Sequence, residues 1–217
     1  NLEQYRKLGL DNSINIESAS NIANLSINAG IKTLNVFFNE DTLSLINAKA
    51  KLINAAGVFF HLEELHSVIK AIKQLLIDDG VLVVQFMYLQ DIVNNLAFDA
   101  IYHEHLCYYT LESLNNLVNL YDLEIFDAHP SEIHGGSMIA KISHIGKYEK
   151  TNNYKKSKLD EKCGLGELLI FSKKVSERKN ELRDFLLNIQ ENNIIYGYGA
   201  PAKSTTLLNY FNIDNSL

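Results

Sequence analysis

The stretch that decides the fold is residues 62–86, LEELHSVIKAIKQLLIDDGVLVVQF. Its first half predicts an amphipathic helix over Leu62–Leu76. The apolar face of that helix comprises Leu65, Val68, Ile69, Ile72, Leu75 and Leu76. After an Asp-Asp-Gly turn at 78–80, Val81–Phe86 is a continuous apolar run, typical of a parallel strand that is buried on both faces. A helix that leads into such a strand predicts an α/β protein.

The residues before this stretch repeat the same alternation of strand and helix. The expected strands are Ser13–Glu17, Ile31–Phe38 and Lys51–Phe59, and the expected helices are Ala19–Ala29 and Asp41–Ala50. We expect these strands and Val81–Phe86 to lie in one parallel, doubly wound sheet. The glycine-rich loop of such a sheet belongs about 20 residues before an acidic residue such as Glu17. Here that position precedes Asn1, so we expect a sheet that lacks its first strand.

The residues after the stretch predict an edge to this sheet and a second, partial domain. Leu111–Tyr121 is an amphipathic helix, and Leu123–Ala128 and Ser137–His144 suit two antiparallel closing strands. The elements expected further on are a polar linker over 147–158, one long helix over Leu159–Glu191 kinked at Gly164 and Gly166, a strand Ile194–Tyr198, a turn Gly199–Lys203 and a helix Ser204–Tyr210. We therefore expect a partial domain over 1–146, a linker over 147–158, and the beginning of a C-terminal Rossmann-like domain over 159–217. Both ends read as cut within a longer protein.

Composition excludes several classes of protein. The chain has 217 residues, 47% of them apolar, and a formal net charge of −6, which suits a globular protein and opposes binding to nucleic acid or an anionic membrane. Cys107 and Cys163 are single and far apart, so we expect neither a disulfide framework nor a paired-cysteine zinc site. We find no apolar run of about 18 residues and no signal peptide, and expect a cytoplasmic protein.

Residues 102–105, Tyr-His-Glu-His, are the densest cluster of titratable side chains. On a helix, Tyr102 and His105 would share one face. Imidazole suits proton transfer near neutral pH, a nearby Glu fixes its tautomer, and a Tyr hydroxyl stabilises a developing oxyanion. The alternatives are structural packing and a metal site, although this spacing fits no common zinc motif. His61 follows a predicted strand, where a ligand would lie, or else it is a capping or surface residue.

Three further positions suggest ligand binding. Glu17 closes a strand at the place where an acidic residue accepts hydrogen bonds from a ribose, or it is an ordinary polar residue at a strand end. The loop 134–137, His-Gly-Gly-Ser, permits close backbone approach, or it is a tight turn. The turn 197–203, Gly-Tyr-Gly-Ala-Pro-Ala-Lys, offers N–H groups to a phosphate, or it only joins a strand to a helix.

Four blocks together resemble a known family. They are DDGVLVVQFMYLQD (78–91), FDAIYHEHLCYYTLESL (98–114), HPSEIHGGSM (129–138) and YGYGAPAKSTTLLNY (196–210). These blocks are similar to the S-adenosylmethionine-dependent sugar C-methyltransferases, which add a methyl group to carbon 3 of a nucleotide-linked 4-keto-deoxyhexose. The resemblance implies a class I methyltransferase (Rossmann-like) domain without its first strand, then the start of a second Rossmann-like domain. The family's N-terminal zinc-binding domain has no counterpart in this sequence.

The resemblance also assigns roles residue by residue. His105 matches the proposed catalytic base, Tyr102 and Glu104 match residues that contact the sugar or orient the base, and His61 matches an active-site histidine. The implied reaction passes through an enolate of the 4-keto sugar. Tyr102 or His61 would donate a hydrogen bond to the enolate oxygen. Glu17 matches the acid that binds the cofactor ribose.

The remaining assignments complete the expected site. The expected cofactor is S-adenosylmethionine, bound by Glu17, Ser18, Phe37 and Ala56. The expected substrate is a nucleotide-diphosphate sugar that His134 and Lys203 contact, and no metal is expected. Two departures from the family are Gly57 in place of a usual Asn before His61, and Ser204 in place of a usual Gly after Lys203. The rival interpretations are a nucleotide-dependent oxidoreductase, which needs a complete dinucleotide fingerprint, and a non-catalytic nucleotide-binding remnant.

Overall fold

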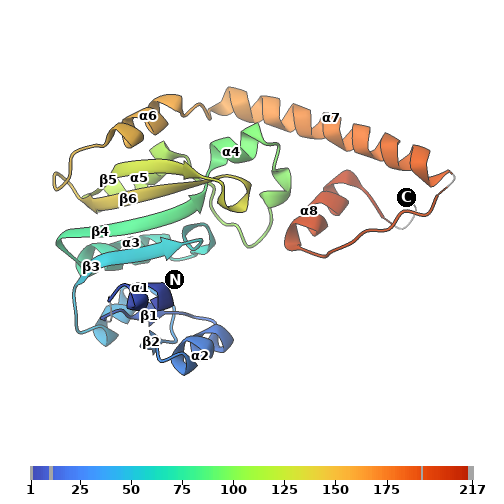
Figure 1. Cartoon of the computed structure of the whole chain (residues 1–217). Coiled ribbons are helices and arrows are strands. Elements are labelled where there is room, and N and C mark those ends of the chain that lie inside the picture. The colour runs from blue at the N-terminus through green and yellow to red at the C-terminus, as the bar shows by residue number, and fades with distance from the viewer. Residues whose placement is uncertain (1, 10–11, 192, 215–217) are drawn as a thin grey trace.

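A computed structural model describes residues 2–9, 12–191 and 193–214 (Figure 1). Its strands are β1 (Asn15–Ile16), β2 (Thr33–Leu34), β3 (Ala50–Ala56), β4 (Leu76–Met87), β5 (Leu123–Ser131) and β6 (Ser137–His144). Its α-helices are α1 (Leu2–Lys7), α2 (Ser20–Asn28), α3 (Leu65–Leu75), α4 (Leu89–Asn94), α5 (Leu111–Asn119), α6 (Asn152–Asp160), α7 (Leu165–Gln190) and α8 (Ala202–Phe211). Four 3-10 helices are η1 (Asp41–Leu45), η2 (Phe59–His61), η3 (Phe98–Ala100) and η4 (Ile133–Gly135).

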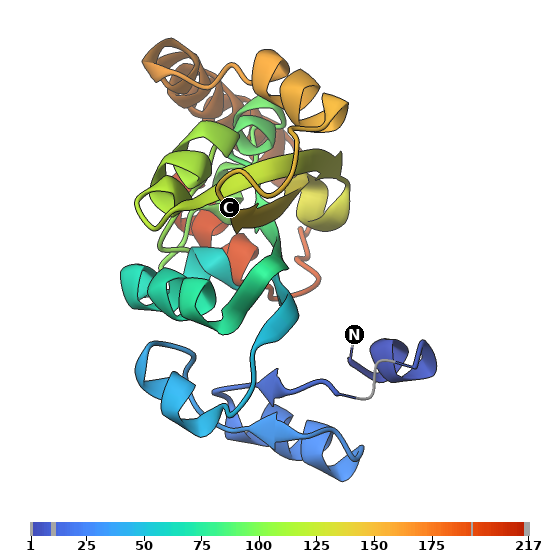
Figure 2. The ribbon, with the colours of Figure 1, turned by 90° about the vertical axis from the view of Figure 1, so that its left-hand side faces the viewer.

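A four-stranded sheet in the order β3-β4-β6-β5 is the centre of the molecule. β3 and β4 are parallel, whereas β6 runs antiparallel to both β4 and β5, which confirms the predicted antiparallel edge. The predicted turn at 78–80 lies inside β4, where the β3–β4 register is irregular between Ala50 and Leu52. Helices α3 and α5 lie on the same side of this sheet (Figure 2).

The core fills the space between this sheet and its helices. The largest fully buried side chains are Phe59, Ile69, Ile72, Leu82, Val84, Phe86, Leu111, Leu114, Leu123, Ile125, Met138 and Ile142. They come from both walls of that space, as the alternating and helical apolar patterns predict. Burial of this many large side chains is the main source of the stability of the fold.

The N-terminal strands do not join this sheet, so the prediction of one parallel sheet is wrong. β1 and β2 form a separate parallel pair, which lies below β3 in Figures 1 and 2. Within the described ranges no strand pairs with β1 on the side away from β2, or with β3 on the side away from β4. The strands of one sheet are joined by main-chain hydrogen bonds. No described strand lies between β1 and β3 to make such bonds with both, so the two strands belong to two sheets. Asn39 Nδ2 to Glu64 Oε2 (2.9 Å) and Glu40 N to Ser67 Oγ (3.1 Å) link η1 to α3.

The C-terminal third departs from prediction at three places. The domain boundaries remain predictions, but the 147–158 segment is not a plain linker, because α6 packs on β5 with Tyr154 buried. The predicted long helix is interrupted: α6 ends at Asp160, and α7 begins after Gly164, whose N–H donates to Glu167 Oε2 at 2.9 Å.

The predicted strand Ile194–Tyr198 is not formed. Its side chains Ile194, Tyr196 and Tyr198 are exposed, and among the described residues no strand pairs with it. A strand without a neighbour has no partners for its N–H and C=O groups, which explains the irregular backbone. The helix that follows is present as α8. Across the described residues, no helix is both long enough and apolar enough to cross a membrane.

Candidate active site

The segment between η3 and α5 carries the Tyr-His-Glu-His cluster to the carboxyl ends of β3 and β4. Tyr109 forms a parallel bridge with Tyr88, and its carbonyl accepts the Leu89 N–H at 2.9 Å. The Leu106 N–H donates to the carbonyl of Phe60 at 2.7 Å. These bonds bring the segment beside η2, which ends at His61, so His61 and the cluster lie together although they are far apart in the sequence.

His105 has the geometry of a proton acceptor. Its Nδ1 lies 2.7 Å from the carbonyl oxygen of Ala100, and because a carbonyl only accepts, Nδ1 carries the hydrogen. In the neutral ring this leaves Nε2 with a lone pair. The imidazole is buried, with 8% of the residue exposed. Burial lowers the pKa of His105, the Ala100 hydrogen bond opposes this effect, and the nearby His61 and Lys203 lower the pKa further.

Aromatic rings enclose this imidazole. Its ring centroid lies 4.0 Å from that of Tyr102, 5.0 Å from that of Phe60 and 5.1 Å from that of His61. Burial, and then the charge of Glu104, raise the pKa of Tyr102, so its hydroxyl keeps its proton at neutral pH. Tyr102 is therefore a hydrogen-bond donor next to a base.

The cluster is a turn, whereas the sequence analysis considered its geometry on a helix. The His105 N–H donates to the Tyr102 carbonyl at 2.9 Å, which closes a turn that places the two rings on the same side. The side chain of His103 points to solvent, 3.9 Å from Glu104. The pairing of Tyr102 with His105 is thus as predicted, although a turn produces it, since a turn also places residues three apart near each other.

His61 and Glu104 meet through the backbone. His61 Nδ1 lies 2.7 Å from the carbonyl oxygen of Glu104, so Nδ1 carries the hydrogen here as well. The Glu104 side chain is 60% exposed and has no hydrogen bond to either imidazole in this part of the structure. Glu104 therefore orients His61 with its main chain, and its carboxylate acts on the site through its charge.

The predicted cofactor residues lie at or after the carboxyl ends of β1, β2 and β3. Glu17 and Ser18 follow β1, Phe37 follows β2, and Ala56 is the last residue of β3. Glu17 Oε1 accepts the Ala19 N–H at 2.8 Å, and its other oxygen has no bond among the described residues. The Phe37 side chain is 79% exposed. This arrangement suits an adenosine group: the carboxylate of Glu17 can accept hydrogen bonds from ribose hydroxyls, and the exposed ring of Phe37 can stack on the adenine.

Asn35 holds the turn that follows β1, and the sequence did not indicate this role. Its Nδ2 donates to the carbonyls of Glu17 (2.7 Å) and Ser18 (3.0 Å), and its Oδ1 accepts from Ser20 Oγ at 2.9 Å. These bonds fix the turn that presents Glu17. In the sequence, Asn35 is only a single polar residue next to the short strand β2. That position does not distinguish a residue that holds a turn from an ordinary loop residue.

His134 lies in the loop between β5 and β6, at the same end of the sheet. It is exposed and adopts a left-handed backbone conformation with φ of 59°. Gly136 follows with φ of 133°, and a Cβ there would lie 2.5 Å from Asp91 Cβ, so only glycine fits. Gln85 Nε2 donates to the buried Ser137 Oγ at 2.8 Å and secures the end of the loop. Gln85, a polar residue within the apolar run of β4, and Asp91 were not predicted as site residues.

Lys203 approaches from the first turn of α8. Its charge is one of the smaller causes that lower the pKa of His105. Phe211 of α8 stacks on Phe98 of η3 with ring centroids 4.8 Å apart. The structure thus brings together the rings of His61, Tyr102 and His105, whereas Glu17, Ser18 and Phe37 lie on the separate N-terminal sheet. In the ranges that the structure describes, no group of three or more His, Cys, Asp or Glu is placed to hold a metal ion.

Comparison with known proteins identifies the family of this chain. A mixed α/β sheet with the predicted site residues at the carboxyl ends of parallel strands suits a class I methyltransferase fold. Residues 5–128 match the methyltransferase domain family, and residues 132–217 match the C-methyltransferase C-terminal domain. The chain belongs to the methyltransferase domain family.

A curated relative and two solved structures sharpen this result. The C-methyltransferase NovU of Streptomyces niveus is 26% identical over 216 residues, which cover 95% of this chain and 51% of NovU. The chain therefore spans about half the length of this relative. The plantazolicin methyltransferase BpumL, solved with a pentazolic desmethylPZN analog and SAH, superposes with a TM-score of 0.52 at 11% identity, over 65% of this chain and 70% of that one. A Haloferax volcanii complex of a methyltransferase with the Trm112 activator gives a TM-score of 0.52 at 9% identity, over 66% and 77%. These two structures support the fold alone.

Proposed function

We propose that this protein transfers a methyl group from S-adenosylmethionine to carbon 3 of a nucleotide-linked 4-keto-deoxysugar, in the cytoplasm. The observation that carries the proposal is the tautomer of His105. Its Nδ1–H is held by the Ala100 carbonyl, so a neutral His105 offers Nε2 as a base in a buried, aromatic-lined site. The matches to C-methyltransferases favour a carbon atom as the acceptor.

Removal of a proton from carbon 3 is the first step. The ketone at carbon 4 acidifies this C–H bond, and Nε2 of His105 takes the proton. The electron pair of the broken bond forms an enolate whose charge lies on the ketone oxygen. Tyr102 is the donor that suits this oxygen, because its hydroxyl keeps its proton. Neutral His61 presents Nε2 as an acceptor, since its hydrogen is on Nδ1, and this favours Tyr102 over His61 as the donor.

The cofactor would be held by the residues at the ends of β1, β2 and β3. Bound S-adenosylmethionine supplies an electrophilic methyl group on a sulfonium. The free oxygen of Glu17 would accept hydrogen bonds from the ribose, and the open face of Phe37 would stack on the adenine. Ser18 and Ala56 would line the space between them.

The nucleotide diphosphate would lie towards α8. The positive charge of Lys203 lowers the pKa of His105, and the same charge would neutralise phosphate oxygens. His134, exposed on the β5–β6 loop, would contact the sugar or its phosphate from the other side. The rival of a nucleotide-dependent oxidoreductase depended on a strand before the Gly197–Lys203 turn, and that strand is not formed.

Proton exchange tests the proposal without the methyl donor. The keto sugar nucleotide is incubated with the protein in deuterium oxide, and loss of the carbon 3 proton is followed by NMR. We expect exchange with the wild type and none above background with His105→Asn. His103→Asn is the matched control, because His103 points to solvent, and should exchange at nearly the wild-type rate. Exchange that persists in His105→Asn would move the role to another residue, with His61 the next candidate.

A further inference from the structure

The carboxyl half of β4 carries one polar side chain among apolar ones. Gln85 is only 6% exposed, and its neighbours Val84 and Phe86 are fully buried. A buried amide costs free energy unless both of its ends form hydrogen bonds. The partners of its two ends therefore decide whether Gln85 serves only the packing of the sheet or also a ligand.

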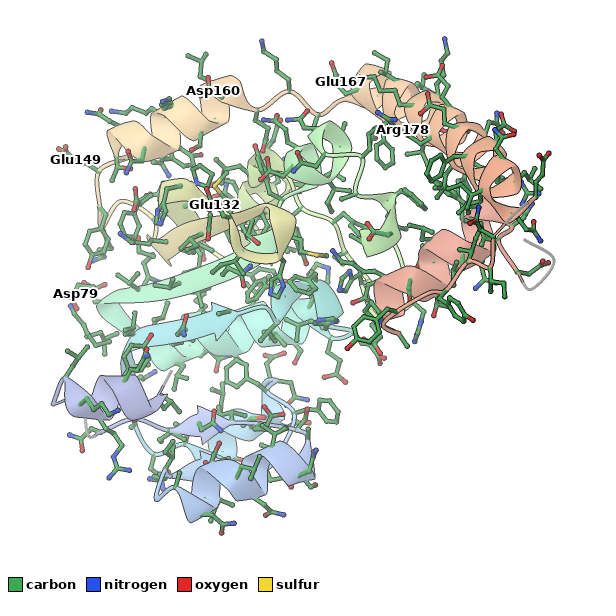
Figure 3. The ribbon with its side chains drawn as sticks, turned by 45° about the vertical axis from the view of Figure 1, so that its right-hand side comes forward. Asp79, Glu132, Glu149, Asp160, Glu167 and Arg178 are labelled. Carbon is green, nitrogen blue, oxygen red and sulfur yellow. The ribbon has the colours of Figure 1, made fainter. Side chains whose placement is uncertain are left out.

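The nitrogen end of this amide has its partner inside the protein. Gln85 Nε2 donates to Ser137 Oγ at 2.8 Å, and Ser137 Oγ donates its single hydrogen to the carbonyl of Ile133 at 2.7 Å. Because that hydrogen is used, Ser137 can only accept from Gln85, and this fixes which end of the amide is the nitrogen. The same bonds hold the end of the β5–β6 loop, in which Glu132 is labelled in Figure 3.

The oxygen end of the same amide faces open space. Within the described ranges, no donor forms a hydrogen bond with Gln85 Oε1. The described residues also include no fully enclosed side-chain oxygen or nitrogen without a partner, so Oε1 is accessible. A Cβ on Gly57 would lie 3.7 Å from Oε1, and the φ of Gly57, 70°, favours glycine. With no side chain at position 57, Oε1 is left as an unused acceptor.

Gln85 points to the face of the sheet opposite the proposed base. Successive side chains of a strand alternate between faces, so Gln85 points away from the side of Phe86. The ring of Phe86 packs edge-on against Tyr109, whose hydroxyl donates to the Phe59 carbonyl at 3.2 Å. The segment that carries the proposed base therefore lies on the Phe86 side. On the Gln85 side lies the exposed Ala56, which is the register partner of Gln85 in β3.

The cofactor has one group that suits this oxygen. Of the carbon substituents on its sulfonium, the methyl group has to face the carbon beside His105, and the adenosyl group would lie towards Glu17 and Phe37. The amino acid chain is left with the side away from the base, where Gln85 lies. This chain ends in a carboxylate, which only accepts hydrogen bonds, and an ammonium, which donates them. An amide oxygen can therefore bind the ammonium and not the carboxylate.

We propose that Gln85 Oε1 binds the α-ammonium group of the cofactor, in the space that Gly57 leaves open at the end of β3. Ser137 holds the amide in one orientation, so little side-chain freedom is lost on binding. The direction of the amino acid chain rests on the proposed function, because His105 is there the base that the methyl group faces.

A pair of matched ligands isolates the ammonium. Calorimetry gives the affinity of the protein for S-adenosylhomocysteine and for its deamino analogue, in which a hydrogen replaces the amino group. The preference for S-adenosylhomocysteine over the analogue is compared between the wild type and Gln85→Leu, which has an apolar side chain of similar size. We expect the variant to lose about 10- to 100-fold of this preference, the range for a hydrogen bond to a charged group. Its affinity for the analogue should change little.

Control variants separate a ligand contact from support of the loop. Gln90→Leu removes a glutamine of α4 whose amide bonds to Asp160 and Lys162, and should keep the wild-type preference. Ser137→Ala breaks the bonds that hold the loop but keeps Oε1, so most of the preference should remain. If Gln85→Leu does not fold, Gly57→Ala takes its place, because the added methyl would cover Oε1 and lower the preference.

The ratio of the two affinities decides the proposal. A wild type without any preference for S-adenosylhomocysteine, or a Gln85→Leu variant with an unchanged preference, would overturn it. A loss of the same size in Ser137→Ala would show that Gln85 only secures the loop, and would overturn it as well. No sugar nucleotide is present in this measurement, so its failure is distinguishable from failure of the His105 exchange test.

Discussion

The two halves of the molecule that meet at the candidate site are built differently. The half that carries His105 rests on the four-stranded sheet, where Leu82, Leu114 and Ile142 are fully buried. In the half that carries Glu17, the described residues before β3 include only two buried side chains, Ala23 and Thr42. Polar contacts such as those of Asn35 hold this half together. The proposed base therefore lies in the well-packed half, and the expected cofactor residues lie in a half with few buried side chains and a lower free-energy cost of local opening.

The largest effect that we expect separates chemistry from cofactor binding. His105→Asn should lower turnover by roughly two to four orders of magnitude, the range for losing a general base. Binding of S-adenosylhomocysteine, measured by calorimetry, should stay near the wild-type affinity because Glu17 and Phe37 are untouched. His103→Asn is again the control, with much smaller loss. A parallel fall of cofactor affinity in His105→Asn would break the division between the halves.

The second effect compares the packing of the two halves. Leu114→Ala should lower the free energy of unfolding by about 2–5 kcal/mol, because it leaves a cavity in a core that cannot collapse fully. Ile27→Ala in α2 removes a side chain that is 48% exposed, and should change stability by no more than about 0.5 kcal/mol. Urea denaturation measures both. If both variants lose the same free energy of unfolding, the N-terminal half is packed as tightly as the four-stranded sheet and its helices.

The third effect is the converse of the first. Glu17→Gln should weaken S-adenosylhomocysteine binding by about 10- to 100-fold, the range for losing hydrogen bonds to a charged group. The amide oxygen still accepts the Ala19 N–H, so the melting temperature should stay the same. Asp41→Asn is a matched loss of charge in the same half. If both variants bind the cofactor equally well, Glu17 is not a ribose ligand.

The smallest effect is a shift of the acid limb of activity. Burial disfavours the imidazolium form, so the folded pKa of His105 lies below its ordinary value of 6.5. The base therefore stays neutral as pH falls through 6.5, and the decline of kcat/KM on the acid side should begin below this pH. The same shift makes protonation cost stability, since the unfolded chain takes up the proton first as pH falls. An acid limb at or above 6.5 would indicate a different base or an exposed His105.

The elements that the sequence predicted well are those with local causes. The apolar spacing of α3 and the run of β4 were correct, as were the antiparallel pair β5 and β6 and the helix α8. Local pattern did not decide how strands pair, so it placed β1 and β2 in the main sheet. It also gave a strand at Ile194–Tyr198, whose existence depends on a neighbour. The interruption at Gly164 was indicated by its glycines, but as a kink within one helix and not as a break between two.

For the candidate site, the sequence determined which residue types were available and which of them were close along the chain. It paired Tyr102 with His105 because residues three apart meet in a turn as well as in a helix. Only the tertiary structure decided that His61 joins them, through the bond from Leu106 to Phe60, and that both imidazoles carry their hydrogen on Nδ1. The tautomer depends on which carbonyl lies opposite each ring. For His61 that carbonyl belongs to Glu104, 43 residues further along the chain, and no local pattern contains such a contact.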